Sequence, residues 1–330
     1  MEFKLVSEAL GFRLHSIAKR DDVPVVRIAK RYVCERVIDF ENWQAAFGPA
    51  PMMLKGGLLF ADHVRPTDDA DIQSVRHYSE DELLNGMRRM KDILLDGGIE
   101  IIDARVKYID VGYGDPVSRL AFQAKVGGIR VSTQVDISSG HGHGPDAFPD
   151  AKDIERCSFP SFATKNHQFP GYTALAQPLE SVLAEKWIAL SQTRPDDNRM
   201  KHFADLLMLH KDFDVDLKKA GEEIVRVCRY RGLHSMDVTN GIRHHFRELN
   251  IMQRGPFWEA IRASRKIDVK LFDAWVDLGL IWKSDFYPHV ITAIGADFRR
   301  RNSRRKMSTS TPAATPEFGN NVVAFRTRGM

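Results

Sequence analysis

Two adjacent glycines, followed at short distance by two aspartates, constrain this chain more than any other feature. The glycines are Gly56 and Gly57, and the aspartates, Asp69 and Asp71, are two residues apart. Glycine has no Cβ, so its backbone N–H group can approach a phosphate closely. The alternating run that ends at Ile72 predicts a strand with both carboxylates on one face. Mg²⁺ prefers such oxygen ligands and takes others from substrate phosphates. The stretch predicts a site for a metal-bound triphosphate.

The residues around the glycines fit the same interpretation. An apolar segment, 51–54, leads into Lys55, and residues 58–64 are predicted to form a short helix whose first N–H groups would point at the same anion. The alternative is an ordinary glycine turn followed by a solvated acidic edge, because short motifs often occur by chance. The two halves together are stronger evidence than either alone.

The composition favours a globular protein without a membrane anchor. With 330 residues, 43% of them hydrophobic, the chain can build one large domain or two ordinary ones. We predict no signal peptide and no membrane span, because the most apolar late segment, 271–282, is interrupted by Asp273 and Asp277. Three widely separated cysteines are typical of reduced structural thiols, so we expect a cytoplasmic protein.

Basic residues are concentrated at the end of the chain. The net charge is +4, and residues 299–330 contain eight Lys and Arg residues beside a single acid, Glu317. This segment is rich in Arg, Ser, Thr and Pro and can bury little apolar area, so we predict a disordered basic tail. Its arginines could contact RNA phosphates, and a solvated tail without that role is the alternative.

Hydrophobic periodicity divides the chain into a mixed first part and a helical second part. Helices are predicted within residues 1–46 and over 79–95, the second ending at Gly97 and Gly98. Three predicted strands form an antiparallel meander, at 99–109, 118–124 and 129–137. Further helices are predicted at 179–190, 199–209, 220–229, 239–249, 256–265 and 270–278.

The last predicted strand ends at another acid, Asp136. It is the best candidate for a third carboxylate directed at a metal, although a lone Asp at a strand end also commonly forms a turn. In the glycine-rich loop that follows, His141 and His143 could ligate a transition metal. No Cys or Glu lies nearby at ligand spacing, which favours a plain loop.

Two helical residues complete the candidate site. Lys186 lies off the centre of an apolar helix stripe, where it could reach a triphosphate or simply extend to solvent. Asp205 has apolar neighbours on both sides, so we predict a buried carboxylate that needs a cationic partner. Lys186 and Arg199 are the candidates for that partner.

Five ordered blocks carry a resemblance to a known family. They are Leu54-Lys55-Gly56-Gly57, Asp69-x-Asp71, Asp136, Ala184-Glu185-Lys186 and Arg199-Met200-Lys201-x-x-x-Asp205. Over roughly residues 10–235, the chain resembles the AbiEii/AbiGii-type nucleotidyltransferase toxin family, a branch of the polymerase-β nucleotidyltransferase superfamily. It departs from the family pattern at His202, at Ala204, and at Ser138 and Ser139, where a glycine-rich continuation is usual. These differences concern substrate choice more than the metal site.

The resemblance implies a function and a role for each matched residue. It implies a toxin of a type IV toxin–antitoxin system that uses Mg²⁺, or Mn²⁺, to transfer a nucleotide from an NTP to an acceptor such as the 3′ end of tRNA. A cognate antitoxin encoded nearby would be its partner. Asp69, Asp71 and Asp136 would bind metal, and Asp205 would orient Lys186 or contact the nucleotide. The nucleotide-binding residues would be Lys55, Gly56, Gly57, Lys186, Arg199 and Lys201.

Two other functions remain open from the sequence. A phosphotransferase could use the same metal, glycines and lysine, because these groups serve phosphoryl and nucleotidyl transfer alike. A non-catalytic module that binds RNA or a protein is the second alternative, with structural acids and a basic tail that holds the partner.

We therefore predict an α+β fold of the polymerase-β type. A mixed sheet with flanking helices would carry the three aspartates, and a helical C-terminal domain would bring Lys186 and Asp205 to the cleft. The predicted parts are N-terminal helices at 1–46, a nucleotidyltransferase core at 47–165, a helical domain at 166–298 and the basic tail at 299–330. Prolines and Gly171 interrupt the periodicity near the second boundary.

Overall fold

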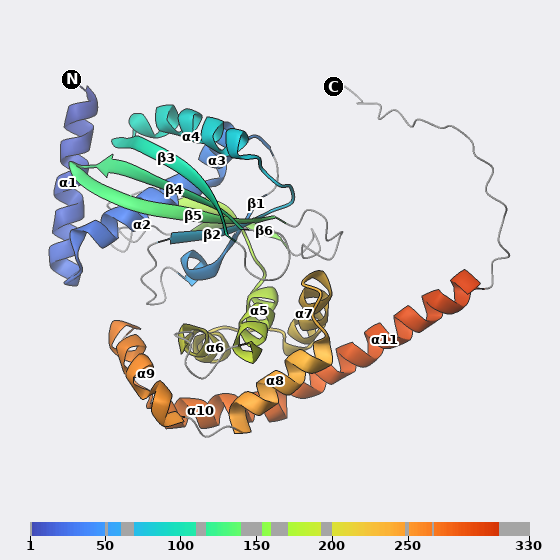
Figure 1. Ribbon diagram of the computed structural model, residues 1–330. Helices are drawn as coiled ribbons and strands as arrows, with labels where there is room; N and C mark the ends of the chain where they lie inside the picture. The colour runs from blue at the N-terminus through green and yellow to red at the C-terminus, as the bar shows by residue number, and fades with distance from the viewer. Residues whose placement is uncertain are drawn as a thin grey trace, which may run out of the picture.

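A single mixed sheet organises the first half of the chain in the computed structural model. The structure describes residues 2–49, 52–60, 69–109, 117–139, 154–159, 171–192, 200–247, 251–265 and 267–309. Its strands are β1 (Met52–Lys55), β2 (Asp69–Ser74), β3 (Ile99–Ile109), β4 (Val117–Val126), β5 (Ile129–Ser139), β6 (Glu155–Phe159) and β7 (Tyr172–Ala176). Their order in the sheet is β3-β4-β5-β2-β1-β7-β6 (Figure 1).

Helices flank this sheet and make up the second half of the chain. They are α1 (Glu2–Asp21), α2 (Val25–Ile38), α3 (Phe40–Phe47), α4 (Glu80–Leu95), α5 (Leu179–Ser191), α6 (Met200–Asp212), α7 (Leu217–Tyr230), α8 (Ser235–Arg247), α9 (Ile251–Arg265), α10 (Leu271–Leu280) and α11 (Tyr287–Thr309). A 3₁₀ helix, η1 (Gly56–Phe60), follows β1, and a π-helix, η5 (Ile281–Phe286), joins α10 to α11. The predicted α+β class, with a mixed sheet followed by a helical region, is confirmed.

The predicted meander is confirmed, and its turn explains its register. β3, β4 and β5 pair antiparallel in sequence order. Gly127 and Gly128 form the two-residue turn between β4 and β5, and both have positive φ, at 55° and 82°. Such turns require left-handed backbone, which glycine adopts without steric cost. The turn pairs Val126 with Ile129 and thereby fixes every pair farther along the two strands.

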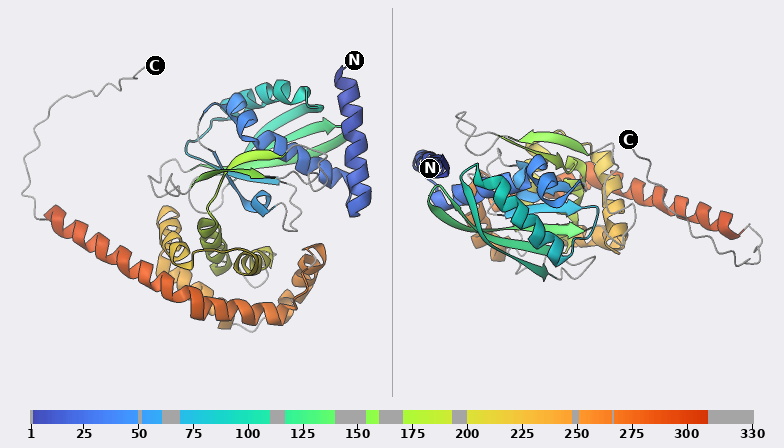
Figure 2. Two further views of the ribbon diagram at one scale, coloured as in Figure 1. Left: turned by 180° about the vertical axis from the view of Figure 1, so that it is seen from behind. Right: turned by 90° about the horizontal axis from the view of Figure 1, so that it is seen from above.

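One face of the sheet is covered by the first four helices. Along β4 every second residue is buried, from Ser118 to Val126. These side chains join the core formed with α1, α2, α3 and α4, and the view from behind shows α2 and α3 lying across the strands (Figure 2). The N-terminal helices therefore pack on the sheet. The alternate residues of β4 face the other way and are partly or fully exposed.

The remaining helices form a second core below the sheet (Figure 1). Trp187 and Trp258 are completely buried in it. Phe60, at the end of η1, also belongs to this core and packs edge-on against Phe213 with ring centroids 5.6 Å apart. Because η1 directly follows β1, the segment after the glycines is held between the sheet and the helices.

Three boundaries differ from the sequence prediction. The predicted helix at 58–64 is η1, which spans Gly56–Phe60 as far as the described residues extend. A helical domain beginning at residue 166 would include β7, but β7 pairs with β1 and belongs to the sheet. The prediction of a disordered tail from residue 299 is wrong for 299–309, because α11 continues through Thr309. The segment buries little apolar area, but Arg and Lys have high helix propensity and allow the helix to continue.

Other predictions concern the cysteines and the membrane. Cys34, Cys157 and Cys228 are free thiols, and Cys34 and Cys228 are buried. None of the helices that the structure describes combines the length and apolar character that a membrane crossing requires. The loop with His141 and His143 and the end of the basic tail, 310–330, lie outside the described residues.

Candidate active site

Strand pairing brings the candidate carboxylates together. β2 and β5 are parallel neighbours, and Asp71 pairs with Asp136 in their register. On the other side of β2, Asp71 pairs with Lys55 of β1. Asp69 lies two residues before Asp71 on the same strand face, since Ala70 between them is buried. The sheet thus places Lys55, Asp71 and Asp136 in one row. The sequence alone shows that these residues are charged but not that they are neighbours.

The first glycine of the pair has a steric role at this row. Gly56 has φ +71°, and a Cβ at this position would collide with the carboxylate of Asp71. Any other residue would be strained in its backbone and would displace that acid. Gly57 is buried within η1. Gly56 therefore allows the end of β1 to lie directly against Asp71.

Helix α5 supplies Lys186, which is held by a buried acid. The Nζ of Lys186 lies 2.8 Å from Oδ2 of Asp205 on α6, and the Asp205 side chain has no exposed surface. The prediction that Asp205 is buried with a cationic partner is confirmed, with Lys186 as that partner. Arg199, the other candidate, lies outside the described residues.

A second acid, the largely buried Glu185, connects α5 to the sheet. Its carboxylate accepts hydrogen bonds from Nζ of Lys55 at 2.8 Å and from Nε2 of Gln177 at 2.9 Å, and Arg231 lies 3.2 Å away. Burial acts to raise the pKa of Glu185, but Lys55, Arg231 and Arg226 outweigh it and lower the pKa to about 2. The sequence analysis assigned Glu185 no role. Its position in a mostly apolar helix was the available signal.

Asp136 also has a partner that the sequence analysis missed. Arg119 of β4 donates from Nε and Nη2 to the two oxygens of Asp136, both at 2.8 Å. Arg119 stands opposite Asp136 in the β4–β5 register. The Gly127-Gly128 turn predicts this pairing, because counting outward from it along both strands leads to these two residues. The paired geometry of two N–H groups on one carboxylate is the strongest kind of neutralising contact.

These residues surround a cavity of about 330 Å³. Its polar walls include Lys55, Gly56, Asp71, Arg119, Asp136, Gln177, Glu185 and Lys186. Of the other predicted residues, Asp69, Gly57 and Asp205 are adjacent to these but do not line it. Lys201 is exposed on α6 and does not line it either. The cavity lies where α5 meets the sheet, so it draws on both parts of the fold.

Among the acids that line this cavity, Asp71 is the one whose charged form is disfavoured by its surroundings. Burial raises the pKa of Asp71, the neighbouring Asp69 and Asp136 raise it further, and Lys186 and Lys55 oppose them. Acids that repel one another in a buried site favour a bound cation. Carboxylate oxygens are the hard ligands that Mg²⁺ takes, so Asp69 and Asp71 fit a metal by donor type.

The third predicted metal ligand is engaged elsewhere. Both oxygens of Asp136 accept hydrogen bonds from Arg119. Consistent with this, the described part of the chain contains no group of three or more His, Cys, Asp or Glu side chains placed to hold a metal ion. The assignment of Asp69, Asp71 and Asp136 as metal ligands stays a prediction, and it requires Asp136 to exchange one of its two Arg119 hydrogen bonds for the metal.

One known family matches the chain over most of its length. The sequence model of the AbiEii nucleotidyl transferase toxins of type IV toxin–antitoxin systems matches residues 40–279. Among solved structures, JHP933 from Helicobacter pylori is 13% identical with a TM-score of 0.44, covering 84% of this chain and 97% of its own. The nucleotidyltransferase toxin MenT4 from Mycobacterium tuberculosis H37Rv is 14% identical with a TM-score of 0.43, covering 64% and 68%. No protein with a curated description matches.

Proposed function

The chain belongs to the AbiEii family of nucleotidyltransferase toxins of type IV toxin–antitoxin systems, and we propose that it transfers a nucleotide from an NTP to an RNA. The proposed acceptor group is the 3′-hydroxyl, the proposed acceptor class is tRNA, and the proposed reaction depends on Mg²⁺. The observation that carries the proposal is the row formed by Lys55, Asp71 and Asp136, which faces Lys186 across one cavity. Family membership also implies an antitoxin as partner.

Asp69 and Asp71 are the proposed ligands of the metal ion, joined by Asp136. When bound, Mg²⁺ would neutralise charge on the triphosphate and polarise the reacting phosphoryl group. Two acids on one strand face suit this role, because a bound cation would relieve the repulsion between their carboxylates, which together with burial raises the pKa of Asp71. Mn²⁺, which accepts the same oxygen ligands, is expected to substitute.

Two lysines are proposed to bind the triphosphate. Lys186 and Lys55 both line the cavity and are both held by acids outside the row, Asp205 and Glu185. A lysine fixed in this way is oriented before the substrate arrives, which lowers the entropic cost of binding. The N–H groups at Gly56 and Gly57 are proposed to contact the phosphates beside them.

Asp136 is proposed to accept the proton of the attacking hydroxyl. In the transfer, the acceptor 3′-oxygen forms a bond to the α-phosphorus, the bond from that phosphorus to the bridging oxygen breaks, and pyrophosphate leaves. Arg119 holds the Asp136 carboxylate through two hydrogen bonds; the metal would replace one of them, and the other would keep Asp136 oriented toward the acceptor. The acids, lysines and glycines thus have separate duties in one in-line displacement.

The test is incubation of the protein with total bacterial RNA, Mg²⁺ and each α-³²P-labelled NTP in turn. Label is expected in a discrete RNA band, with release of pyrophosphate, and no label with Asp71→Asn. Asn keeps the shape of Asp71 and removes its charge, so its folding is expected to be intact by circular dichroism. Label transferred only from γ-³²P-NTP would instead identify a phosphotransferase, and toxicity that survives Asp71→Asn would identify a non-catalytic binding module.

A further inference from the structure

The sheet face that carries the catalytic row continues beyond it over β4 and β3. In the register of these strands, Lys107 stands opposite Arg119, and Arg119 opposite Asp136. The neighbouring row runs through Arg105, Ala121, Gln134 and Asp69, and the next through Asp103, Gln123 and Ser132. Adjacent rows on one face are two residues apart, or about 7 Å. The second row therefore leads directly to the carboxylates.

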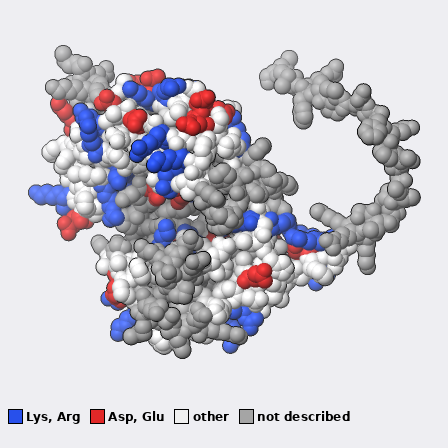
Figure 3. Space-filling view, viewed as in Figure 1, with Lys and Arg blue, Asp and Glu red and all other residues white. Residues whose placement is uncertain are grey.

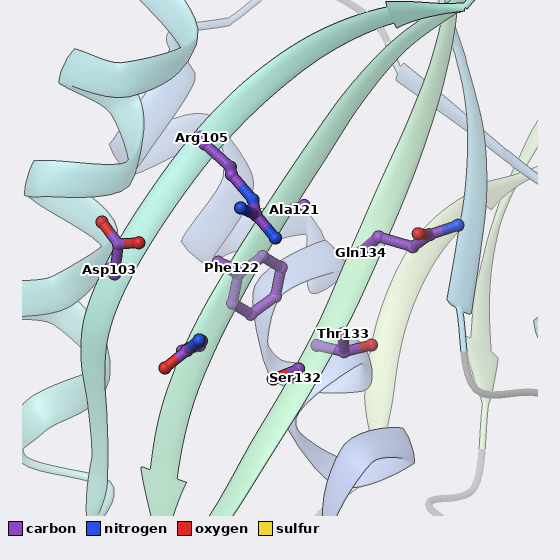
Figure 4. A pocket seen from close by; sticks show the side chains of 8 residues that line it. Asp103, Arg105, Ala121, Phe122, Ser132, Thr133 and Gln134 are labelled. Carbon is purple, nitrogen blue, oxygen red and sulfur yellow. The ribbon is translucent and has the colours of Figure 1, made fainter.

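A hollow of about 190 Å³ occupies this second row. The side chains of the open face that line it are Asp103, Arg105, Ala121, Gln123, Ser132 and Gln134. Ala121 leaves the space, because its neighbours on both sides are larger. Figure 4 shows the Arg105 side chain extending from β3 across β4 beside Ala121, and Gln134 extending from β5 toward β2. A planar group of moderate size would meet hydrogen-bonding groups at its edges and Arg105 at one side.

The charge around the hollow is mostly positive. Apart from the Arg119–Asp136 pair, this face of β3, β4 and β5 carries Arg105, Lys107, Lys125 and Arg130 against Glu100 and Asp103. All four basic residues are exposed. Figure 3 shows Lys and Arg side chains gathered over the part of the surface where Figure 1 draws β3 and β4. A polyanion is the complementary partner.

The position of the hollow selects which substrate it would hold. The proposed phosphate contacts, Lys55, Gly56 and Lys186, lie on the β1 and α5 side of the carboxylates, whereas the hollow lies on the β4 and β3 side. Attacking and leaving oxygens are roughly in line in phosphoryl transfer, so the acceptor approaches from the side opposite the pyrophosphate. The hollow is on that side.

We propose that this hollow binds a base of the single-stranded 3′ end of the acceptor RNA, with the basic rows holding its phosphates. Unpaired RNA bases are commonly recognised by stacking on an Arg guanidinium and by hydrogen bonds at their edges. Arg105 provides the first, and Gln123 and Ser132 provide the second. The inference rests on the proposed transfer to RNA and assigns that acceptor a place.

The test measures binding separately from transfer. A 5′-fluorescein-labelled single-stranded decaribonucleotide with a free 3′-hydroxyl is titrated with wild type, Ala121→Leu and Arg105→Ala by fluorescence anisotropy. Leu fills the hollow on an exposed strand face, and both variants are expected to weaken binding about tenfold, as for loss of one stacked base. If Arg105 also contacts a phosphate, Arg105→Ala lowers the slope of log affinity against log salt by about 0.7.

Two controls separate the hollow from general effects. Ala121→Ser keeps the space open, and Arg88→Ala removes an equal charge from exposed α4, which packs on the covered face. Both are expected to bind as wild type does. NTP affinity, read with a non-hydrolysable analogue, is expected to be unchanged in all variants, and transfer assays should show a raised KM for RNA alone.

Each result of these binding and transfer assays either supports or overturns the inference. Wild-type RNA affinity in Ala121→Leu and Arg105→Ala, or no binding of the oligonucleotide by the wild type, overturns the inference. Weakened NTP binding in these variants also overturns it and assigns the hollow to the nucleotide, and weakened binding of the antitoxin alone assigns the face to that protein. If RNA binding falls as expected but the wild type transfers no nucleotide, the acceptor surface stands and the proposed reaction fails.

Discussion

The site contains two acid–cation pairs of similar geometry in different surroundings. Lys186 and Asp205 approach to 2.8 Å within the helical part, where the side chains are 12% and 0% exposed. Arg119 and Asp136 approach to the same distance on the sheet, where they are 34% and 16% exposed. Burial and not distance distinguishes them, and burial decides what each pair can do.

Separating a buried ion pair has a large free-energy cost. Removing one member leaves a charge without compensation in a medium of low polarity, whereas an exposed partner exchanges the lost contact for water. We infer that Lys186–Asp205 is a permanent part of the fold that presents one cation to the cavity. Arg119–Asp136 can open when a substrate or metal competes for Asp136. The two pairs thus represent a fixed and an exchangeable element of the same site.

The largest effect is expected for Asp205→Ala. It strands Lys186 in a largely buried position, and the loss in free energy of unfolding should be about 3 to 5 kcal/mol, as for other broken buried pairs. Urea denaturation followed by circular dichroism measures it. A loss below about 1 kcal/mol, typical of exposed pairs, would show that the two pairs do not differ as argued.

The double variant Lys186→Met/Asp205→Leu is the matched control for that loss. Replacing both charges with apolar groups of similar size is often neutral for stability, so it should regain most of the loss while nucleotide transfer stays absent. Recovered stability with recovered activity would contradict the proposed role of Lys186.

Glu185 gives a second, smaller effect that depends on pH. Its pKa is about 2 in the folded protein against an ordinary 4.5, a difference that corresponds to about 3 kcal/mol. Because the folded pKa is the lower one, this stabilisation is complete above pH 4.5 and is lost as the pH falls toward 2. The stability difference between wild type and Glu185→Gln should therefore be large at pH 7 and shrink below pH 4.5.

Denaturation at pH 7, 5 and 3.5 measures this difference, with Glu180→Gln on the first turn of the same helix as control. The control should follow the wild type at every pH. A stability difference for Glu185→Gln that stays constant from pH 7 to pH 3.5 would mean that Lys55 and Arg231 do not hold this carboxylate in its charged form.

Much of the fold could be predicted because its signals are local. Ser79 and Glu82 form a capping box at the start of α4, where the sequence predicts that helix, and the strand at 99–109 begins where predicted. The place of β7 could not be predicted in this way. Its pairing with β1 joins residues more than a hundred positions apart, and no local pattern specifies such a partner.

In the candidate site, too, residues with a local sequence signal could be predicted and residues that depend on distant partners could not. The burial of Asp205 beside a cation followed from its apolar neighbours, and the structure identifies Lys186 as that cation. Arg119 was not predicted, because its place opposite Asp136 becomes visible only when residues are counted outward along both strands from the Gly127-Gly128 turn. Glu185 was missed because its partners, Lys55 and Arg231, come from elements that meet only in three dimensions.

The smallest effect on stability and the sharpest on mechanism is expected for Arg119→Ala. Arg119 is about one-third exposed, so its loss should cost less than about 1 kcal/mol in free energy of unfolding. Asp136 would lose the two hydrogen bonds that orient it, and a misplaced proton acceptor can slow a reaction by about a hundredfold. We therefore expect kcat to fall far more than stability, with KM for NTP nearly unchanged.

Arg119→Lys should recover only part of kcat, because an ammonium group cannot engage both carboxylate oxygens in the same plane. Steady-state kinetics beside urea denaturation distinguishes the cases: a loss of several kcal/mol with proportionate loss of activity would make Arg119–Asp136 a fixed pair like Lys186–Asp205, and unchanged kcat would remove Arg119 from the positioning of Asp136.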